Sequence, residues 1–459
     1  MVELYWFAPA KYVQVKENNN QGKTMKLITC ASLLLALSSA SAWAQSTLIY
    51  AGKLLPAANA DVLERQTLEV VDGRVQGIHE GYVSAQTLGL ADAHIIDLKE
   101  QFVMPGLIDL HVHISFERDP QADPERWLKE VEADQALRAT QFLGNTLNAG
   151  FTTVRDLGSY NEVIFPLQRA VENGVIQGPR IIAAGEAVTP TGGHGDLHGY
   201  RQEVLDAFAP RMGVCNGADD CTRAVREIVK AGAQVIKITA TGGVLSNTQA
   251  GLNQQLTDEE MKAIVDTAHN LGRPVTAHAH SAQGVAAALR SGVDSIEHGS
   301  YASDETVALF KSTGAYLVPT LLAGISVSEE VKHNHKVPQA IVDKITQVAP
   351  VVKASFQRAL DEGVNIAFGT DSGVSRHGDN AREFALLVEY GMSPREALAT
   401  SLEQAPKLLN MGKEVGKLQN GYYADVIAVA QSPLKDISQL SAVTFVMKEG
   451  KVIKHHEQD

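Results

Sequence analysis

Cysteine is scarce in this sequence, with three residues among 459. Metal sites built from two Cys pairs are therefore excluded. Cys30 lies in an apolar segment near the N-terminus, which leaves Cys215 and Cys221 in a polar stretch before an expected helix. In an oxidising compartment these two residues can form a disulfide, and the alternative is a pair of free thiols.

A surplus of positive charge is also missing. Lys and Arg number 40 against 53 Asp and Glu, so the formal net charge is -13. Nothing concentrates enough cations to neutralise phosphates, and we therefore expect neither nucleic acid nor an anionic membrane as a partner. The apolar run from Leu27 to Leu37 is too short to span a bilayer comfortably, so we expect no stable membrane anchor.

Residues 25–44 have the order of a secretory signal peptide. Met25-Lys26 precedes the apolar run, and Ala42-Trp43-Ala44 supplies the small residues of a cleavage site. We expect an exported protein, periplasmic or secreted, whose mature chain begins near Gln45 without Cys30. Residues 1–24 are then a non-native N-terminal extension that precedes the true start.

The two terminal segments of the mature chain, 45–103 and 410–459, share short apolar alternating runs that are separated by turns. Asp72-Gly73 between two such runs is a hairpin signal. Neither segment is large enough to hold a core alone. We therefore expect the two to pair into one small β-sandwich subdomain.

Residues 104–409 repeat one pattern, in which a helical stretch ends at Gly and a β-branched run follows at once. The glycines are Gly150, Gly232, Gly272, Gly292, Gly314 and Gly363. Gly ends a helix readily because it adopts the left-handed conformation. With the strand that opens at Pro105 and the run 179–184, the pattern predicts eight strands of a parallel (β/α)8 TIM barrel, an α/β fold. The rival is a doubly wound open sheet, but no Gly-x-Gly-x-x-Gly follows the first strand.

The ends of the expected barrel strands carry residues suited to metal chemistry. His111 and His113 are two residues apart on the first strand, so their side chains point the same way and can meet one ion. The other strand ends carry Lys237, His278, His280, His298 and Asp371. Because function collects at the C-terminal ends of barrel strands, we interpret these residues as one site.

Lys237 stands between Ile236 and Ile238 in an expected strand. Burial of its ammonium group requires a partner or a change of charge. A carbamate formed on the amine is an anion, and its two oxygens can bridge two cations.

This combination of residues resembles the amidohydrolase superfamily, over nearly the whole mature chain. The resemblance implies an enzyme with two divalent metal ions, usually zinc. It places His111, His113 and Asp371 on one ion, His278 and His298 on the other, and carboxylated Lys237 (N6-carboxylysine) with a hydroxide between them. Spacing alone does not separate His278 from His280, and the resemblance favours His278 as the ligand. Asp371 can then take a proton as the tetrahedral species forms and pass it to the leaving amine.

Local phrases narrow the resemblance to an exported branch labelled Xaa-Pro dipeptidase, which is related to imidazolonepropionase and to ochratoxin-cleaving amidases. The phrases include residues 150–158, 191–195, 241–244 and 369–373. They imply hydrolysis of a peptide or amide bond near a free carboxylate, in dipeptides or N-acyl amino acids. We also expect a homo-oligomer.

Five residues are candidate substrate contacts: Arg155, His194, His280, Tyr301 and His377. A carboxylate needs a cation or several donors, which Arg155, His194 or Arg376 can supply. Arg155 is equally suited to a structural pairing with Asp156. Two alternative functions stay open. One is a cyclic amidase, a lactonase or an ochratoxin-type amidase with the same metals, and the other is a noncatalytic, metal-dependent periplasmic binding protein.

Overall fold

A computed structural model describes residues 46–119, 121–123, 125–205 and 212–455. The signal peptide and the extension predicted over residues 1–44 lie outside these ranges. None of the helices found within them is both long enough and apolar enough to cross a membrane.

Strands from both ends of the chain form one mixed sheet of seven strands, in the order β15-β14-β13-β4-β1-β2-β3. They are β1 (Ser46–Leu54), β2 (Leu63–Val71), β3 (Arg74–Glu80), β4 (His94–Pro105), β13 (Val426–Val429), β14 (Val443–Lys448) and β15 (Lys451–His455). The sheet joins the two segments where β13 pairs antiparallel with β4. Asp72 and Gly73, both at positive φ, turn the chain from β2 into β3 as the dipeptide predicts. The sheet has a core of its own around Ile49, Leu68 and Phe445.

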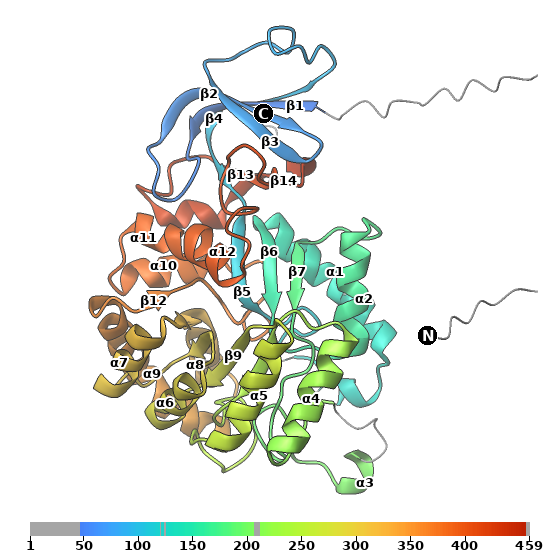
Figure 1. The fold of residues 1–459 in the computed structure, drawn as a ribbon, viewed down its shortest axis with the longest axis vertical. Helices are drawn as coiled ribbons and strands as arrows, with labels where there is room; N and C mark the ends of the chain where they lie inside the picture. The colour runs from blue at the N-terminus through green and yellow to red at the C-terminus, as the bar shows by residue number, and fades with distance from the viewer. Residues whose placement is uncertain (1–45, 120, 124, 206–211, 456–459) are drawn as a thin grey trace, which may run out of the picture. The chain divides into compact units, whose positions relative to one another are not determined.

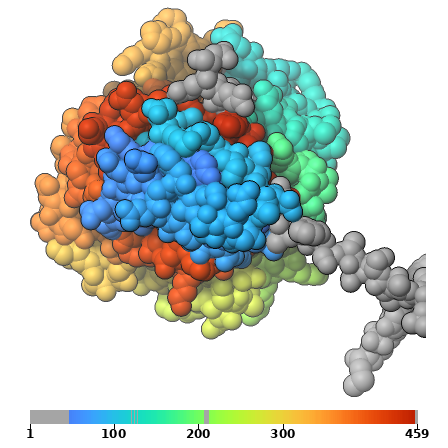
Figure 2. All heavy atoms as spheres, turned by 90° about the horizontal axis from the view of Figure 1, so that it is seen from above, coloured from blue at the N-terminus to red at the C-terminus, as the bar shows by residue number. Residues whose placement is uncertain are grey.

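The early and late strands of this sheet share one end of the molecule, apart from most of the helices (Figure 1). Seen from that end, the surface of the N-terminal strands is bordered by C-terminal residues (Figure 2). The two segments thus form the expected β-sandwich-like subdomain.

Eight parallel strands follow β4 and form the barrel, in two hydrogen-bonded runs, β5-β6-β7 and β12-β11-β10-β9-β8. They are β5 (Leu107–Val112), β6 (Phe151–Asp156), β7 (Arg180–Ala183), β8 (Ile236–Thr239), β9 (Val275–Ala279), β10 (Ser295–His298), β11 (Tyr316–Val318) and β12 (Asn365–Ile366). Two parallel bridges connect the runs, Val188 with Ile238 and Val112 with Ser372. The predicted (β/α)8 barrel is therefore confirmed.

Helices separate the barrel strands or follow the last of them, and most bury apolar side chains in the barrel core. They are α1 (Glu132–Asn148), α2 (Asn161–Glu172), α3 (Gln202–Leu205), α4 (Ala218–Ala231), α5 (Asp258–Asn270), α6 (Ala282–Ser291), α7 (Asp304–Thr313), α8 (Leu321–His333), α9 (Gln339–Asp361), α10 (Arg382–Glu389), α11 (Pro394–Ala399) and α12 (Ala405–Leu408). Gly292 and Gly314 end α6 and α7 at φ values of 96° and 75°, the left-handed conformation expected of them. Between β11 and β12 the chain forms two helices, α8 and α9, which pack on each other.

Cys215 and Cys221 are joined by a disulfide, and both side chains are buried. The bond ties the segment after β7 to the first turn of α4.

Replacing both cysteines by Ala should lower the free energy of unfolding by about 2 kcal/mol, because the bond closes a short loop and restricts the unfolded chain. Urea unfolding in an oxidising buffer measures this difference. In a reducing buffer the free energy of unfolding of the wild-type protein should fall by the same amount and equal that of the variant. Equal unfolding midpoints of the two proteins in the oxidising buffer would contradict the prediction.

Candidate metal centre

Three ligand side chains converge at the C-terminal end of the barrel, where β5 and the segment after β12 lie side by side. Nε2 of His113 lies 3.0 Å from Oδ1 of Asp371, and Nε2 of His111 lies 3.4 Å from the same oxygen. Within the described residues, only this trio brings three candidate ligand atoms within 4.8 Å of one another. Two imidazoles and a carboxylate form a donor set suited to a divalent metal ion.

The Asp371 carboxylate has the features expected of a metal ligand. Its Oδ1 atom is buried, and no donor in the described part of the chain is aligned to hydrogen-bond it. A buried carboxylate oxygen without a donor is costly, and a cation removes that cost. Asp371 also has φ of 60°, and His298 has φ of 72°. Non-glycine residues at such angles are uncommon and concentrate at functional sites.

A second layer of polar contacts holds His111 in place. Its Nδ1 atom lies 2.8 Å from Oε2 of Glu297, so Nε2 is left for the metal ion. Oε1 of Glu297 accepts a hydrogen bond of 2.8 Å from Arg155. Burial alone would raise the pKa of Glu297, but the Arg155 charge and the His111 contact hold that pKa well below its usual value. The carboxylate therefore stays ionised under the metal site.

Arg155, a predicted substrate contact, does not lie in a cavity where a substrate could bind. Its side chain is fully buried in the barrel interior, where it donates to the Leu110 carbonyl and to Glu297. It bonds Glu297 and not its neighbour Asp156, and it lines neither cavity beside the metal site. Arg155 therefore acts through Glu297 and cannot reach a bound substrate.

Four further histidines lie next to the trio. The rings of His278 and His298 are 4.7 Å apart, and the His298 ring is 5.2 Å from that of His111. His280 and His194 flank His278 at 4.7 Å and 4.2 Å. Burial lowers the pKa of His111 and His280 to about 4, and it lowers those of His278 and His298 well below the usual value. Neutral imidazoles are the form that binds metal ions.

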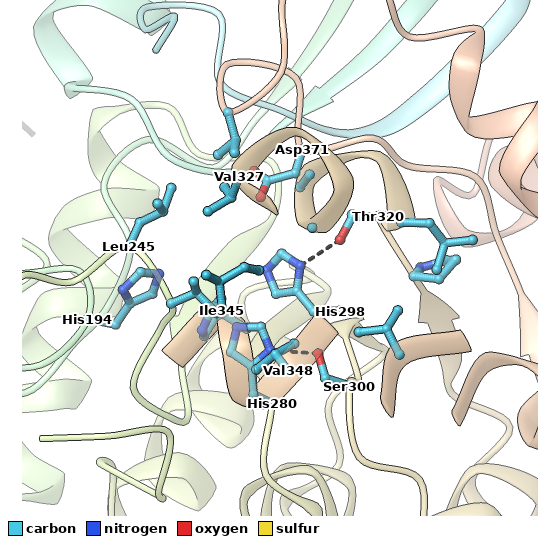
Figure 3. Close-up of a pocket in the computed structure, with 18 of the residues that line it drawn as sticks. His194, Leu245, His280, His298, Ser300, Thr320, Val327, Ile345, Val348 and Asp371 are labelled. Carbon is cyan, nitrogen blue, oxygen red and sulfur yellow. Dashed lines mark hydrogen bonds between the residues drawn. The ribbon is translucent and has the colours of Figure 1, made fainter. Parts of the chain in front are cut away.

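Hydroxyl groups orient several of these imidazoles (Figure 3). Nδ1 of His298 lies 2.6 Å from Oγ1 of Thr320, and Nδ1 of His280 lies 2.8 Å from Oγ of Ser300. His194 makes a similar contact of 2.6 Å with Ser246. Each contact fixes one ring nitrogen, so the Nε2 atom is left to face the cavity.

Lys237 lies beside the histidines on β8, with 4% of its surface exposed. Burial lowers the pKa of its ammonium group to about 8. Among the residues that the structure describes, none forms a hydrogen bond or an ion pair with its amine. The negative charges of Glu297 and Asp371 act on it only at longer range. The amine is thus more easily deprotonated than that of an exposed lysine.

Two cavities adjoin the site. One, of about 300 Å³, has apolar walls from α8 and α9 and includes Asp371, His280 and His298 in its lining. The other, of about 250 Å³, has a more polar lining, which includes Lys237, Glu186 and Ser159 beside Phe116 and Leu157. His113, His194 and His278 line both cavities, so the metal site lies between them.

Two other candidate substrate contacts, Tyr301 and His377, lie outside the lining of both cavities. The Tyr301 hydroxyl donates to the Gln347 carbonyl, and the His377 ring stacks on Phe142 while its Nε2 contacts the Phe116 carbonyl. His194 and His280 do line the apolar cavity, as a substrate contact must.

Sequence reasoning missed two buried acids, Glu297 and Asp109. Asp109 accepts hydrogen bonds from the backbone of His111 and from the backbone and hydroxyl of Thr370, so it links β5 to the residue before Asp371. Asp109 lies between Ile108 and Leu110 in a strand, which is the same signal as for Lys237. Glu297 follows Ile296 and directly precedes the candidate ligand His298.

The fold and the site define a metal-dependent hydrolase built on a (β/α)8 barrel. The chain belongs to the amidohydrolase family, which matches residues 102–453 and confirms the resemblance drawn from the sequence. It is 33% identical to ochratoxinase of Aspergillus niger over 441 residues, 90% of this chain and 87% of that protein.

Solved structures agree with this assignment. A crystal structure of an Xaa-Pro dipeptidase with methionine bound in its active site is 39% identical, with a TM-score of 0.83 over 89% of this chain and 99% of that one. A prolidase complexed with N-methylphosphonate-L-proline is 30% identical, with a TM-score of 0.79 over 90% of this chain and 100% of that one.

Replacing Glu297 by Gln should weaken zinc binding by about 10-fold to 100-fold, because His111 loses the anion that orients it. Competition with a chelating indicator measures the affinity. Glu69→Gln is the matched control, since Glu69 contacts His79 at 2.7 Å in the terminal sheet, and it should bind zinc like the wild type. Unchanged affinity in Glu297→Gln would show that this contact does not support the metal site.

Proposed function

We propose that this amidohydrolase releases the C-terminal residue from dipeptides or N-acyl amino acids. The observation that carries the proposal is the convergence of His111, His113 and Asp371 with four more histidines between two cavities. The Xaa-Pro dipeptidase and prolidase neighbours support a substrate of this class. The preference for proline is not part of the proposal.

The site residues suit two divalent ions, which we take to be zinc. His111, His113 and Asp371 would hold one ion, and the adjacent rings of His278 and His298 would hold the other. A carboxylated Lys237 would bridge them, and the lowered pKa of its amine favours that modification. Two bound cations lower the pKa of a water molecule between them and polarise the scissile carbonyl.

Asp371 is the candidate general acid and base. It lines the apolar cavity, and its Oδ1 lies 3.0 Å from Nε2 of His113 and 3.4 Å from Nε2 of His111. The carboxylate would accept the proton of the attacking water and return it to the leaving amine nitrogen. One carboxylate oxygen would bind the metal ion, and the other would carry this proton.

A substrate carboxylate must find donors other than Arg155. His194 and His280 line the apolar cavity, and their Nδ1 atoms are already held by Ser246 and Ser300. Their Nε2 atoms would donate to the carboxylate when the serine hydroxyls donate to Nδ1. This arrangement uses several neutral donors in place of one cation.

An ochratoxin-type amidase is the second candidate. The identity to ochratoxinase and the apolar walls of the larger cavity favour a bulky amide substrate.

We also propose that the mature chain, from Gln45 onward, is exported and assembles into a homo-oligomer.

The function is tested by screening zinc-reconstituted protein against dipeptides and N-acyl amino acids that vary in the C-terminal residue. We expect release of the free amino acid, its loss on chelation and its recovery when zinc is returned. Opening of cyclic amides or esters without amino acid release would support the lactonase alternative. Inertness toward every amide and ester would instead favour a binding protein.

Asp371→Asn should lower kcat by about 100-fold to 10,000-fold, because the amide cannot shuttle the proton. The measurement is kcat on the best substrate of the screen, with bound zinc determined in the same samples. Asp379→Asn is the control, since Asp379 is only partly buried, pairs with Arg382 and lines neither cavity. Full turnover by a zinc-loaded Asp371→Asn enzyme would refute this role.

A further inference from the structure

The walls of the larger cavity are contributed mainly by two helices. Figure 3 shows Val327 of α8, Ile345 and Val348 of α9, and Leu245 from the segment after β8 around the cavity beside the metal site. Val352 of α9 also lines this cavity. We call this part of the cavity, defined by these five residues, the α8–α9 chamber. It can remove a large apolar group from water, which is favourable by about 25 cal/mol for each Å² buried.

The chamber offers no partner to a charged side chain. Among residues whose positions are described, no Lys or Arg lines this cavity, and its only carboxylate is Asp371 at the metal site. Transfer of an unpaired charge into such a place is strongly unfavourable. A side chain that occupies the chamber would therefore be apolar and uncharged.

The second cavity is more polar than the first, although Phe116, Leu157 and Ala187 also line it. Ser115, Ser159, Glu186 and Thr239 line it, together with His113 and His278 of the metal site. An amide whose carbonyl lies at the metal site can thus extend one half into apolar surroundings and the other half into polar ones.

The position of Asp371 sets the direction of the substrate. Asp371 lines the chamber side and not the polar cavity. A carboxylate that returns its proton to the leaving nitrogen must lie on the side of the amine. The amine half of the substrate therefore extends into the α8–α9 chamber.

We propose that the α8–α9 chamber is the subsite for the released residue and selects large, uncharged, apolar side chains there, while the polar cavity receives the acyl half. This inference rests on the proposed function and adds the substrate class to it.

The chamber is held in shape before any ligand binds. Both carboxylate oxygens of buried Glu383 accept hydrogen bonds from the first turn of α8, at 2.9 Å from Leu321 and 2.7 Å from Leu322. The buried ammonium of Lys344 on α9 donates to the carbonyls of Gly243 and Ser246 at 2.9 Å and 2.5 Å, which fixes Leu245 against α9. A preformed pocket discriminates between side chains by size, because it does not collapse around small ones.

Gly324 offers a direct way to fill the chamber. It lies on α8, lines the cavity, and a Cβ atom added there would meet no atom within 4 Å. Gly144 on α1 is the matched control, since it is also helical, its added Cβ would also meet nothing, and it lines neither cavity. Replacement of either glycine by Leu favours the helix.

The test measures kcat/KM of the zinc-loaded enzyme on dipeptides Ser-Yaa, with Gly, Ala, Leu, Phe, Asp or Lys as Yaa, and on the reversed peptides Leu-Ser and Phe-Ser. We expect Ser-Leu and Ser-Phe to exceed Ser-Ala by at least about 10-fold. The Asp and Lys peptides should be the poorest, and the reversed peptides should fall below their partners. Gly324→Leu should reduce kcat/KM for Ser-Phe at least about 10-fold more than for Ser-Ala, whereas Gly144→Leu should change neither.

Three results would overturn the subsite without touching the proposed function: a preference for charged Yaa, equal rates on reversed peptides, or a uniform effect of Gly324→Leu. If Gly324→Leu does not fold, Gly324→Ala takes its place. It should reduce kcat/KM for Ser-Phe relative to Ser-Ala in the same direction, but by less. If no amide is hydrolysed, the proposed function fails, and calorimetric binding of N-acetyl-L-phenylalaninamide tests the chamber alone. If the wild type binds this amide and Gly324→Leu does not, the result supports the chamber as a binding site. If the wild type does not bind it, or if both proteins bind it equally, the result refutes the chamber.

Discussion

The buried ion pair between Arg155 and Glu297 is the interaction on which the metal site depends. Arg155 on β6 and Glu297 on β10 meet inside the barrel, and their contacts reach Leu110 on β5 and Thr276 on β9. Removal of one partner from such a pair leaves an uncompensated charge and typically costs about 3–5 kcal/mol. This charge pair therefore connects four strands and orients His111.

Asp109 also supports the His111, His113 and Asp371 trio, through contacts with His111 and Thr370. It accepts hydrogen bonds from Thr370 and Asn380, and this holds the segment that places Asp371 against His111. Burial raises the pKa of Asp109 to about 6, whereas the Arg155 charge and the His111 contact hold the pKa of Glu297 below its usual value. These polar contacts support the ligands, and helices α8 and α9 form the wall that a substrate would meet.

Much of this architecture was predictable because it depends on local rules. Gly292 and Gly314 mark helix ends because they tolerate left-handed backbone, and the alternation of side chains puts His111 and His113 on one side of β5. The pairing of Arg155 with Glu297 joins residues 142 positions apart, across the barrel. Sequence spacing carries no information about such a contact, so it leaves Arg155 open between a substrate contact and a pairing with Asp156.

The substrate side was harder to predict than the metal side. Tyr301 and His377 follow barrel strands, as ligands do, but a loop residue can turn toward a neighbouring helix or carbonyl as easily as toward the cavity. The apolar chamber arises from the packing of α8 on α9, and the sequence marks both helices without showing which residues face the metal site.

The central claim is that these residues form a two-metal hydrolytic centre. Anomalous scattering at the zinc absorption edge, from crystals of the zinc-loaded protein, tests it most directly. The account predicts two peaks, one among His111, His113 and Asp371 and one beside His278 and His298, with density for a carboxylated Lys237 between them. No peak at the trio would contradict the account, and a single peak there beside an unmodified lysine would contradict its two-metal form.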